Sequence, residues 1–262
     1  MRRYLRLLAI QLRISVASAI AYRANFLIEG AMSALWMAIT LLPLVVVYRG
    51  RDSVAGWTAP EALIVIAYFV GVRAILEGLI SPSLVDLVER IRSGSFDYVL
   101  LKPIDAQAMV SASRYEPWKV FDLLAAIAIA VYAFVLRGAA PPPGDLALGV
   151  ALFATGVLAT YALWIVCAAA AFWVGRLDNL MYLLGAVFDT ARWPVQVFPG
   201  AWRLVFTFVI PVAVMTTYPA MALLGTLDAS TALATLGGSL ALLAISRVVW
   251  RTAIRNYTSA SS

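Results

Sequence analysis

The sequence predicts an all-α integral membrane protein, and three observations lead to this fold class. Hydrophobic residues make up 63% of the chain and charged residues only 13%, whereas soluble domains are about half apolar and about a quarter charged. Long uncharged runs recur, each near the ~20 residues that a helix needs to cross a ~30 Å hydrocarbon core. Arginines stand beside these runs, as is typical of segments that flank a membrane.

Composition also excludes several function classes. The chain has no histidine, and its single cysteine, Cys167, lies in an apolar run. We therefore expect no enzyme active site, no metal site and no disulfide bond. Lys102 and Lys119, the two lysines, follow leucine and tryptophan, so a G-x-x-x-x-G-K phosphate loop is absent. The net charge of +6 suits anchoring beside the membrane better than nucleic-acid binding.

Residues 1–24 are expected to form an amphipathic helix that lies on the membrane. Apolar residues share one stripe of this segment and arginines line its flank. A signal peptide is the other interpretation, but Arg13 interrupts the apolar core that such a peptide needs.

The first two spans are expected over residues 27–48 and 61–80. The first of them has no charged residue from Gly30 to Tyr48. The second contains Arg73 and Glu77, four residues apart on one helical face. Two interpretations stay open: a structural ion pair that faces protein, or a substrate or relay site within the membrane.

Residues 81–117 form the longest polar interval and are expected to bind a partner. Ser81 and Pro82 favour a helix start, and Gly94 favours its end. A compact apolar and aromatic segment follows, closed by Pro103. The alternative is that this loop only packs on its own spans. The expected contact residues are Leu84, Leu87, Val88, Ile91, Phe96, Asp97, Tyr98, Leu100, Leu101 and Lys102.

Three further spans are expected over residues 118–136, 146–174 and 228–248, which are all predominantly apolar. The region 180–227 is ambiguous because several prolines interrupt it. It contains one span and a re-entrant hairpin, only a later span, or two spans. The arginine distribution argues against two spans, because they would place the C-terminal arginines outside.

Four short motifs follow one another along nearly the whole chain. The loop reads GSFDYVLLKP from Gly94 to Pro103, and ARWP and VFPG lie between Ala191 and Gly200. TFVIP and YPA follow between Thr207 and Ala220, and then Gly225. The tail carries Trp250, Arg251, Arg255 and NYTSAS up to Ser261. Each motif alone is weak. Their order and spacing together resemble the ABC-2 family of export permeases.

The resemblance implies a six-span permease with an N-terminal connecting helix over 1–24 and a cytoplasmic coupling helix within 81–117. It also implies a span over 180–196 and an extracytoplasmic re-entrant hairpin over 201–226. Such permeases work as dimers with an identical or a sister chain in the bacterial cytoplasmic (inner) membrane, with both termini cytoplasmic. A separate ATP-binding-cassette subunit binds ATP and magnesium, so this chain needs no cofactor.

Apolar and aromatic side chains of the spans are candidates for contact with an amphipathic or lipid-like substrate. For each of them, packing against lipid or other helices is the alternative. These candidates are Met32, Trp36, Phe69, Met181, Phe188 and Trp193.

Other function classes fit less well. A channel needs rings of charge or a carbonyl filter, and the intramembrane charges are too few. An intramembrane enzyme needs histidine, paired aspartates or a metal. An ion-coupled transporter that uses the Arg73–Glu77 pair is the alternative to an ATP-driven exporter.

Overall fold

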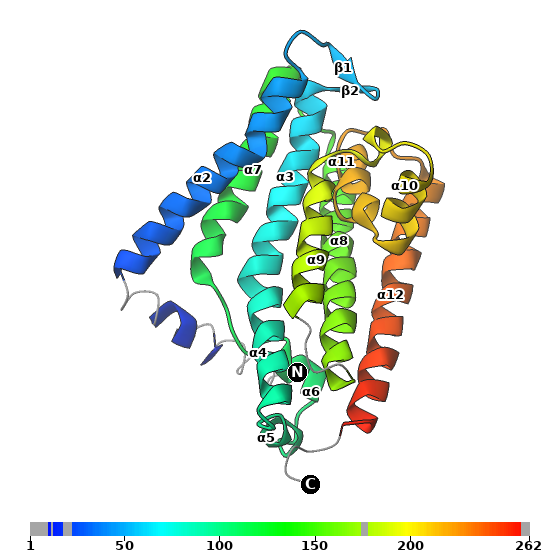
Figure 1. The fold of residues 1–262 in the computed structure, drawn as a ribbon. Helices are drawn as coiled ribbons and strands as arrows, with labels where there is room; N and C mark the ends of the chain where they lie inside the picture. The colour runs from blue at the N-terminus through cyan, green and yellow to red at the C-terminus, as the bar shows by residue number, and fades with distance from the viewer. Residues whose placement is uncertain (1–9, 12, 18–22, 174–177, 258–262) are drawn as a thin grey trace.

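The computed structural model describes residues 10–11, 13–17, 23–173 and 178–257, which form a bundle of helices (Figure 1). The helix expected over residues 1–24 lies largely outside the described residues. The long helices are α2 (Arg23–Val47), α3 (Ala59–Ile75), α4 (Ser81–Arg92), α7 (Val120–Arg137), α8 (Pro143–Ala169) and α12 (Ala229–Arg255). The shorter elements are β1 (Ser53–Val54), β2 (Trp57–Thr58), α5 (Asp97–Leu100), α6 (Ala106–Val110), α9 (Asp178–Phe188), α10 (Ala201–Leu204) and α11 (Tyr218–Leu223).

In the part of the chain that the structure describes, five helices are long and apolar enough to cross a membrane. They are Leu27–Val47, Ala59–Arg92, Pro117–Arg137, Pro143–Phe172 and Ala229–Arg255. These helices identify a multi-pass membrane protein. Helix α9 has 11 residues, which is shorter than a perpendicular span requires. The span expected over 180–196, the fifth in chain order, therefore stays a prediction.

The second span does not end where the sequence suggested. Helix α3 continues through a π-helical turn, Leu76–Ile80, directly into α4, so Ser81 and Pro82 lie inside one 34-residue helix. Pro82 has no N–H for the carbonyl of Gly78 four residues earlier. The Glu116 N–H donates to that carbonyl instead, at 2.8 Å. The wider π turn thus accommodates the proline without breaking the helix.

Helix α3 lies at the centre of the bundle. Its residues 62–67 are all buried, which agrees with its nearly continuous apolar sequence, because a helix that is apolar all round is buried on every side. It packs along α7 and against α8 and residues 213–217, while α8 packs along α12.

Helix α2 leans away from the bundle and contacts it at few points (Figure 1). Beyond its C-terminal end, the Tyr48 hydroxyl donates to the Trp57 carbonyl at 3.0 Å. Most of its large apolar side chains are exposed in the single chain, including Leu27, Ile28, Leu35, Trp36, Leu42, Val45 and Val46.

Residues 201–223 form two short helical arms that meet near Pro211. The first arm contains α10 and the second contains α11, and each includes one π-helical turn. The second arm packs on α8. A Cβ atom on Gly156 of α8 would lie 3.1 Å from the Val214 carbonyl oxygen and 3.2 Å from Met215 Cα. A side chain larger than that of glycine would therefore push the two backbones apart.

We expect Gly156→Val to lower the free energy of unfolding by about 1–3 kcal/mol, because the new methyl groups would force α8 away from the second arm. Reversible unfolding in mixed micelles measures this change. Gly237→Val is the matched control, because a Cβ on Gly237 of α12 meets nothing within 4 Å. Equal losses in both variants would contradict the close-packing argument.

Candidate functional site

An aromatic cluster attaches the loop between α4 and α6 to the bundle. Phe96 lies edge-to-face against Phe172 at a centroid distance of 5.3 Å, and against Trp250 at 6.3 Å. Tyr257 completes the cluster, with its ring 5.3 Å from that of Phe96. Phe96 and Trp250 are buried. Such contacts add to the apolar burial of the rings, so the loop is held firmly against the ends of α8 and α12.

Polar contacts attach the same loop at a second point. Arg247 of α12 binds the Asp105 carboxylate through both terminal nitrogens and donates to Gln107 Oε1 at 2.6 Å. Gln107 Nε2 in turn donates to the Tyr161 hydroxyl of α8 at 2.9 Å. The hydrogen bonds from Arg247 hold the pKa of Asp105 below its usual range. This network keeps α6 in register with α8 and α12.

The expected docking residues fall into a buried and an exposed group. Leu84, Leu87, Val88 and Phe96 are buried inside this chain, so in this conformation they anchor the loop and are not available to a partner. Ile91 and Asp97 are half-buried, and Lys102 is exposed. The α5 turn presents Tyr98, Leu100 and Leu101, of which Tyr98 is 70% and Leu101 79% exposed. We call Tyr98, Leu100, Leu101 and Lys102 the α5 knob. It lies at the tip of the molecule (Figure 1).

A partly exposed ion network connects α2, α3, α7 and the turn after α9. Arg73 Nε donates to Glu77 Oε1 at 2.7 Å, and Arg73 Nη1 donates to Asp189 Oδ1 at 3.2 Å. Lys119 Nζ donates to Glu77 Oε2 at 2.6 Å and to Asp122 Oδ2 at 3.2 Å. The Arg73–Glu77 pair that the sequence predicts is thus part of a larger network of ion pairs.

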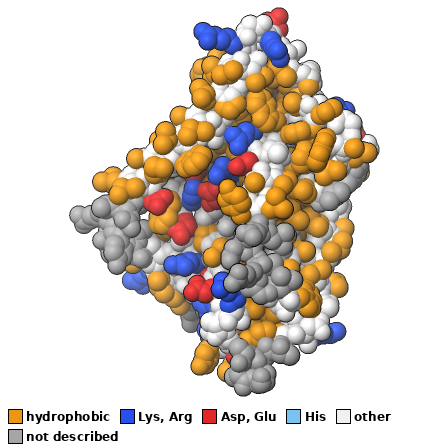
Figure 2. All heavy atoms as spheres, in the orientation of Figure 1, with side chains coloured by type: hydrophobic (Ala, Val, Ile, Leu, Met, Phe, Trp, Pro, Cys, Tyr) orange, Lys and Arg blue, Asp and Glu red, His pale blue; other side chains and the backbone are white. Residues whose placement is uncertain are grey.

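The network continues at both ends. The Ser33 hydroxyl of α2 donates to Asp122 Oδ1, and Arg192 lies 3.7 Å from Asp189. The cations Arg73, Lys119 and Arg192 balance the anions Glu77, Asp122 and Asp189. Charged side chains gather in the middle of the face in Figure 2, among hydrophobic ones. We call these six side chains and Ser33 the ion network.

Sequence reasoning missed five members of this network. Lys119, Asp122, Asp189 and Arg192 stand near the ends of apolar runs, where charges are commonly interpreted as flanks. Ser33 is a single hydroxyl inside a span. Lys119–Asp122 and Asp189–Arg192 are local pairs three residues apart. No spacing rule connects these pairs with each other, with Glu77 or with Ser33, because only tertiary packing brings them together.

The candidate substrate contacts lie in different environments. Met32 and Trp36 are exposed on α2, whereas Phe69 and Phe188 are buried against each other at a centroid distance of 5.4 Å. Trp193 is half-buried, and the side chain of Met181 lies outside the described residues. The guanidinium groups of Arg73 and Arg192 lie 5.9 and 5.8 Å from the centre of the Phe69 ring. The structure therefore places Phe69 in the packing around the ion network. Among the described residues, no group of three or more histidine, cysteine, aspartate or glutamate side chains is arranged to hold a metal ion.

Comparison with known proteins agrees with this architecture. The family model described as "ABC-2 family transporter protein" matches residues 34–261. No curated protein and no solved structure matches the chain. The family match covers most of the sequence, including the loop that carries the α5 knob and the ion network except Ser33. The chain therefore belongs to the ABC-2 transporter family, as a multi-pass membrane permease of an ABC transporter.

Proposed function

We propose that this chain is the permease half of an exporter that a separate ATP-binding subunit drives. One observation carries the proposal: the α5 knob exposes aromatic and aliphatic side chains on a loop that is otherwise tightly anchored. An exposed apolar cluster on a rigid base is typical of a protein–protein contact. The family match supports an ATP-binding cassette subunit as the partner.

The continuous helix Ala59–Arg92 offers a route from this contact to the membrane. At ~1.5 Å per residue, its 34 residues extend about 50 Å. A force on the α5 knob acts on α4 through their shared loop, and α4 is continuous with α3. ATP binding would favour one of two conformations by binding it more tightly, and this helix would transmit the change.

A second permease chain, identical or sister, is proposed to cover α2. The exposed apolar side chains of α2 include the candidate substrate contacts Met32 and Trp36. A dimer that pairs these helices would place both residues at its seam, where an amphipathic substrate can pass. The remaining exposed surface of α2 would face lipid.

The finer topology is also proposed. Helix α9 with the turn up to Arg192 is a short fifth span, α12 is the sixth, and residues 201–226 are the re-entrant hairpin. The two arms lie toward the end of the bundle that carries β1 and β2, opposite the α5 knob (Figure 1). With the knob in the bacterial cytoplasm, the hairpin would face outside, and α12 would end in the cytoplasm.

The ion network is the observation that favours the alternative, an ion-coupled transporter. Each of its carboxylates already has a cationic partner. This pairing favours a structural role, in which the ion network holds α2, α3, α7 and the turn after α9 together, over a proton relay, which needs a carboxylate that can exchange protons. We therefore assign the network a structural role in the exporter.

The double substitution Leu100→Asp/Leu101→Asp is expected to abolish co-purification with the ATP-binding subunit. Two desolvated charges in an apolar contact would cost binding free energy of several kcal/mol. Pull-down and ATPase stimulation measure the effect. Ala108→Asp is the control, since it adds a charge to an exposed position of α6 in the same loop. A complex that survives the double substitution would refute docking through the α5 knob.

Glu77→Gln is expected to destabilise the chain by about 1–3 kcal/mol, because Arg73 and Lys119 each lose an anionic partner in a partly exposed site. The double variant Glu77→Gln/Lys119→Gln should recover part of this loss, and unfolding in mixed micelles measures both. Asp86→Asn breaks the i,i+4 pair with Arg90 on α4 and should cost about 0.5 kcal/mol. Additive losses from Glu77 and Lys119 would argue against a coupled network.

A further inference from the structure

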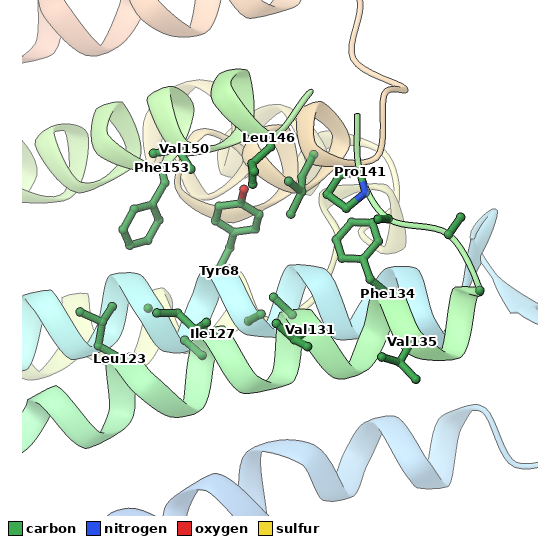
Figure 3. A pocket seen from close by; sticks show the side chains of 18 residues that line it. Tyr68, Leu123, Ile127, Val131, Phe134, Val135, Pro141, Leu146, Val150 and Phe153 are labelled. Atoms are coloured by element: carbon green, nitrogen blue, oxygen red, sulfur yellow. The ribbon is translucent and has the colours of Figure 1, made fainter. Parts of the chain in front are cut away.

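A cavity of about 720 Å³, open along one side, lies between α3, α7 and the N-terminal half of α8. Figure 3 shows Tyr68 of α3 rising between Ile127 and Val131 of α7 on one side and Leu146 and Val150 of α8 on the other. Nearly all of its lining is apolar, and the Tyr68 hydroxyl is one of the few polar groups near it. It is separate from both the α5 knob and the ion network, none of whose residues line it.

The cavity exists because two consecutive helices do not pack on each other. Gly138, in a left-handed conformation, ends α7, and a proline-rich connection leads to α8. Both helices pack on α3 and have no extensive contact with each other. Small residues of α3, Ala67 and Gly71, form the floor of the gap. A Cβ on Gly71 would lie 3.2 Å from the Phe153 ring, so its side-chain space is already taken.

Its surroundings determine what can fill this cavity. Helices α7 and α8 both belong to predicted membrane spans, so the cavity lies at the depth of the lipid hydrocarbon. Water needs two to four polar partners, and this lining offers almost none. An unfilled void would forfeit dispersion contacts along its whole wall. Hydrocarbon is the one abundant component of the membrane that satisfies both conditions.

A cation lies next to the cavity lining in the sequence. Arg137 is the last residue of α7 and directly precedes Gly138, which lines the cavity. Its Nε lies 3.9 Å from Glu61 Oε1, beyond hydrogen-bond length. The other oxygen of Glu61 accepts from the Thr58 N–H at 3.0 Å, as part of the N-terminal cap of α3. This ion pair occupies one edge of the Arg137 guanidinium group, and its other N–H groups can donate to an anion at the membrane surface.

We infer that this cavity binds one acyl chain of a bilayer glycerophospholipid, with the phosphate against Arg137. The chain lies between α7 and α8 and reaches Phe153 and Leu223, so the lipid joins α7 to the second arm of the 201–223 hairpin. This lipid is a bound component of the fold and not a transported molecule. The inference does not rest on the proposed exporter function, because lipid retention needs neither ATP nor the partner subunit.

Native mass spectrometry of the detergent-purified chain, with palmitoyl-oleoyl phosphatidylglycerol added back after delipidation, tests this site. The wild type should bind one lipid tightly. Ala130→Trp and Ile127→Trp place an indole inside the cavity and should weaken that binding at least tenfold. Arg137→Gln should weaken it about tenfold, the effect of one charge-assisted hydrogen bond. Size-exclusion elution and circular dichroism establish that each variant is folded.

Two matched controls separate this site from the general lipid shell. Ala128→Trp places the same indole on α7 at an exposed position outside the cavity, and Arg51→Gln removes a charge from the same end of the molecule. Both should bind like the wild type. Equal binding in all variants, or equal loss in Ala130→Trp and Ala128→Trp, would overturn the site. Unchanged binding in Arg137→Gln would overturn the assignment of the phosphate.

Discussion

The carbonyl oxygen of Gly78 lacks the donor that an α-helix normally supplies four residues later, and much of the structure depends on how it is satisfied. Pro82 removes the N–H that an α-helix would supply, and the helix widens into a π turn. The Glu116 N–H then donates to this carbonyl, which brings the start of α7 against α3. The same contact positions Lys119 beside Glu77. A Cβ on Gly78 would lie 3.0 Å from Lys119 Cβ, so a larger residue would push the two segments apart at this crossing.

The sequence was sufficient to predict the all-helical membrane architecture, because long apolar runs have few other solutions. It was less informative about where helices end. Ser81 and Pro82 carry the ordinary signal of a helix start, yet the preceding helix continues through them, since a neighbouring segment supplies the missing donor. Helix α9 covers its apolar run and ends at Phe188, before the end of the span over 180–196 that the resemblance implies. The chain turns at Asp189–Arg192, where the Thr216 hydroxyl donates to the Ala191 carbonyl, and the Val195 N–H beyond the turn donates to the Thr217 hydroxyl.

The residues of the loop between α4 and α6 show that prediction from sequence is also limited at the level of single side chains. Phe96 and Leu101 are both apolar residues of one short segment, but Phe96 is buried and Leu101 is 79% exposed. The difference comes from Phe172, Trp250 and Tyr257, which lie far away in sequence and surround only Phe96. A pattern can thus identify the segment that carries a contact surface. It does not separate anchoring residues from contacting ones.

Helix α2 has a further consequence for the fate of a chain that has not yet assembled. Lipid tails are as apolar as leucine, so its exposed face costs little free energy in the bilayer and gives no signal of an incomplete complex. The polar contact between Ser33 and Asp122 is different. If α2 moved away, a carboxylate would lose a donor within the membrane, where such a loss is expensive. Displacing α2 would therefore cost more free energy than leaving a correctly placed α2 without a partner chain.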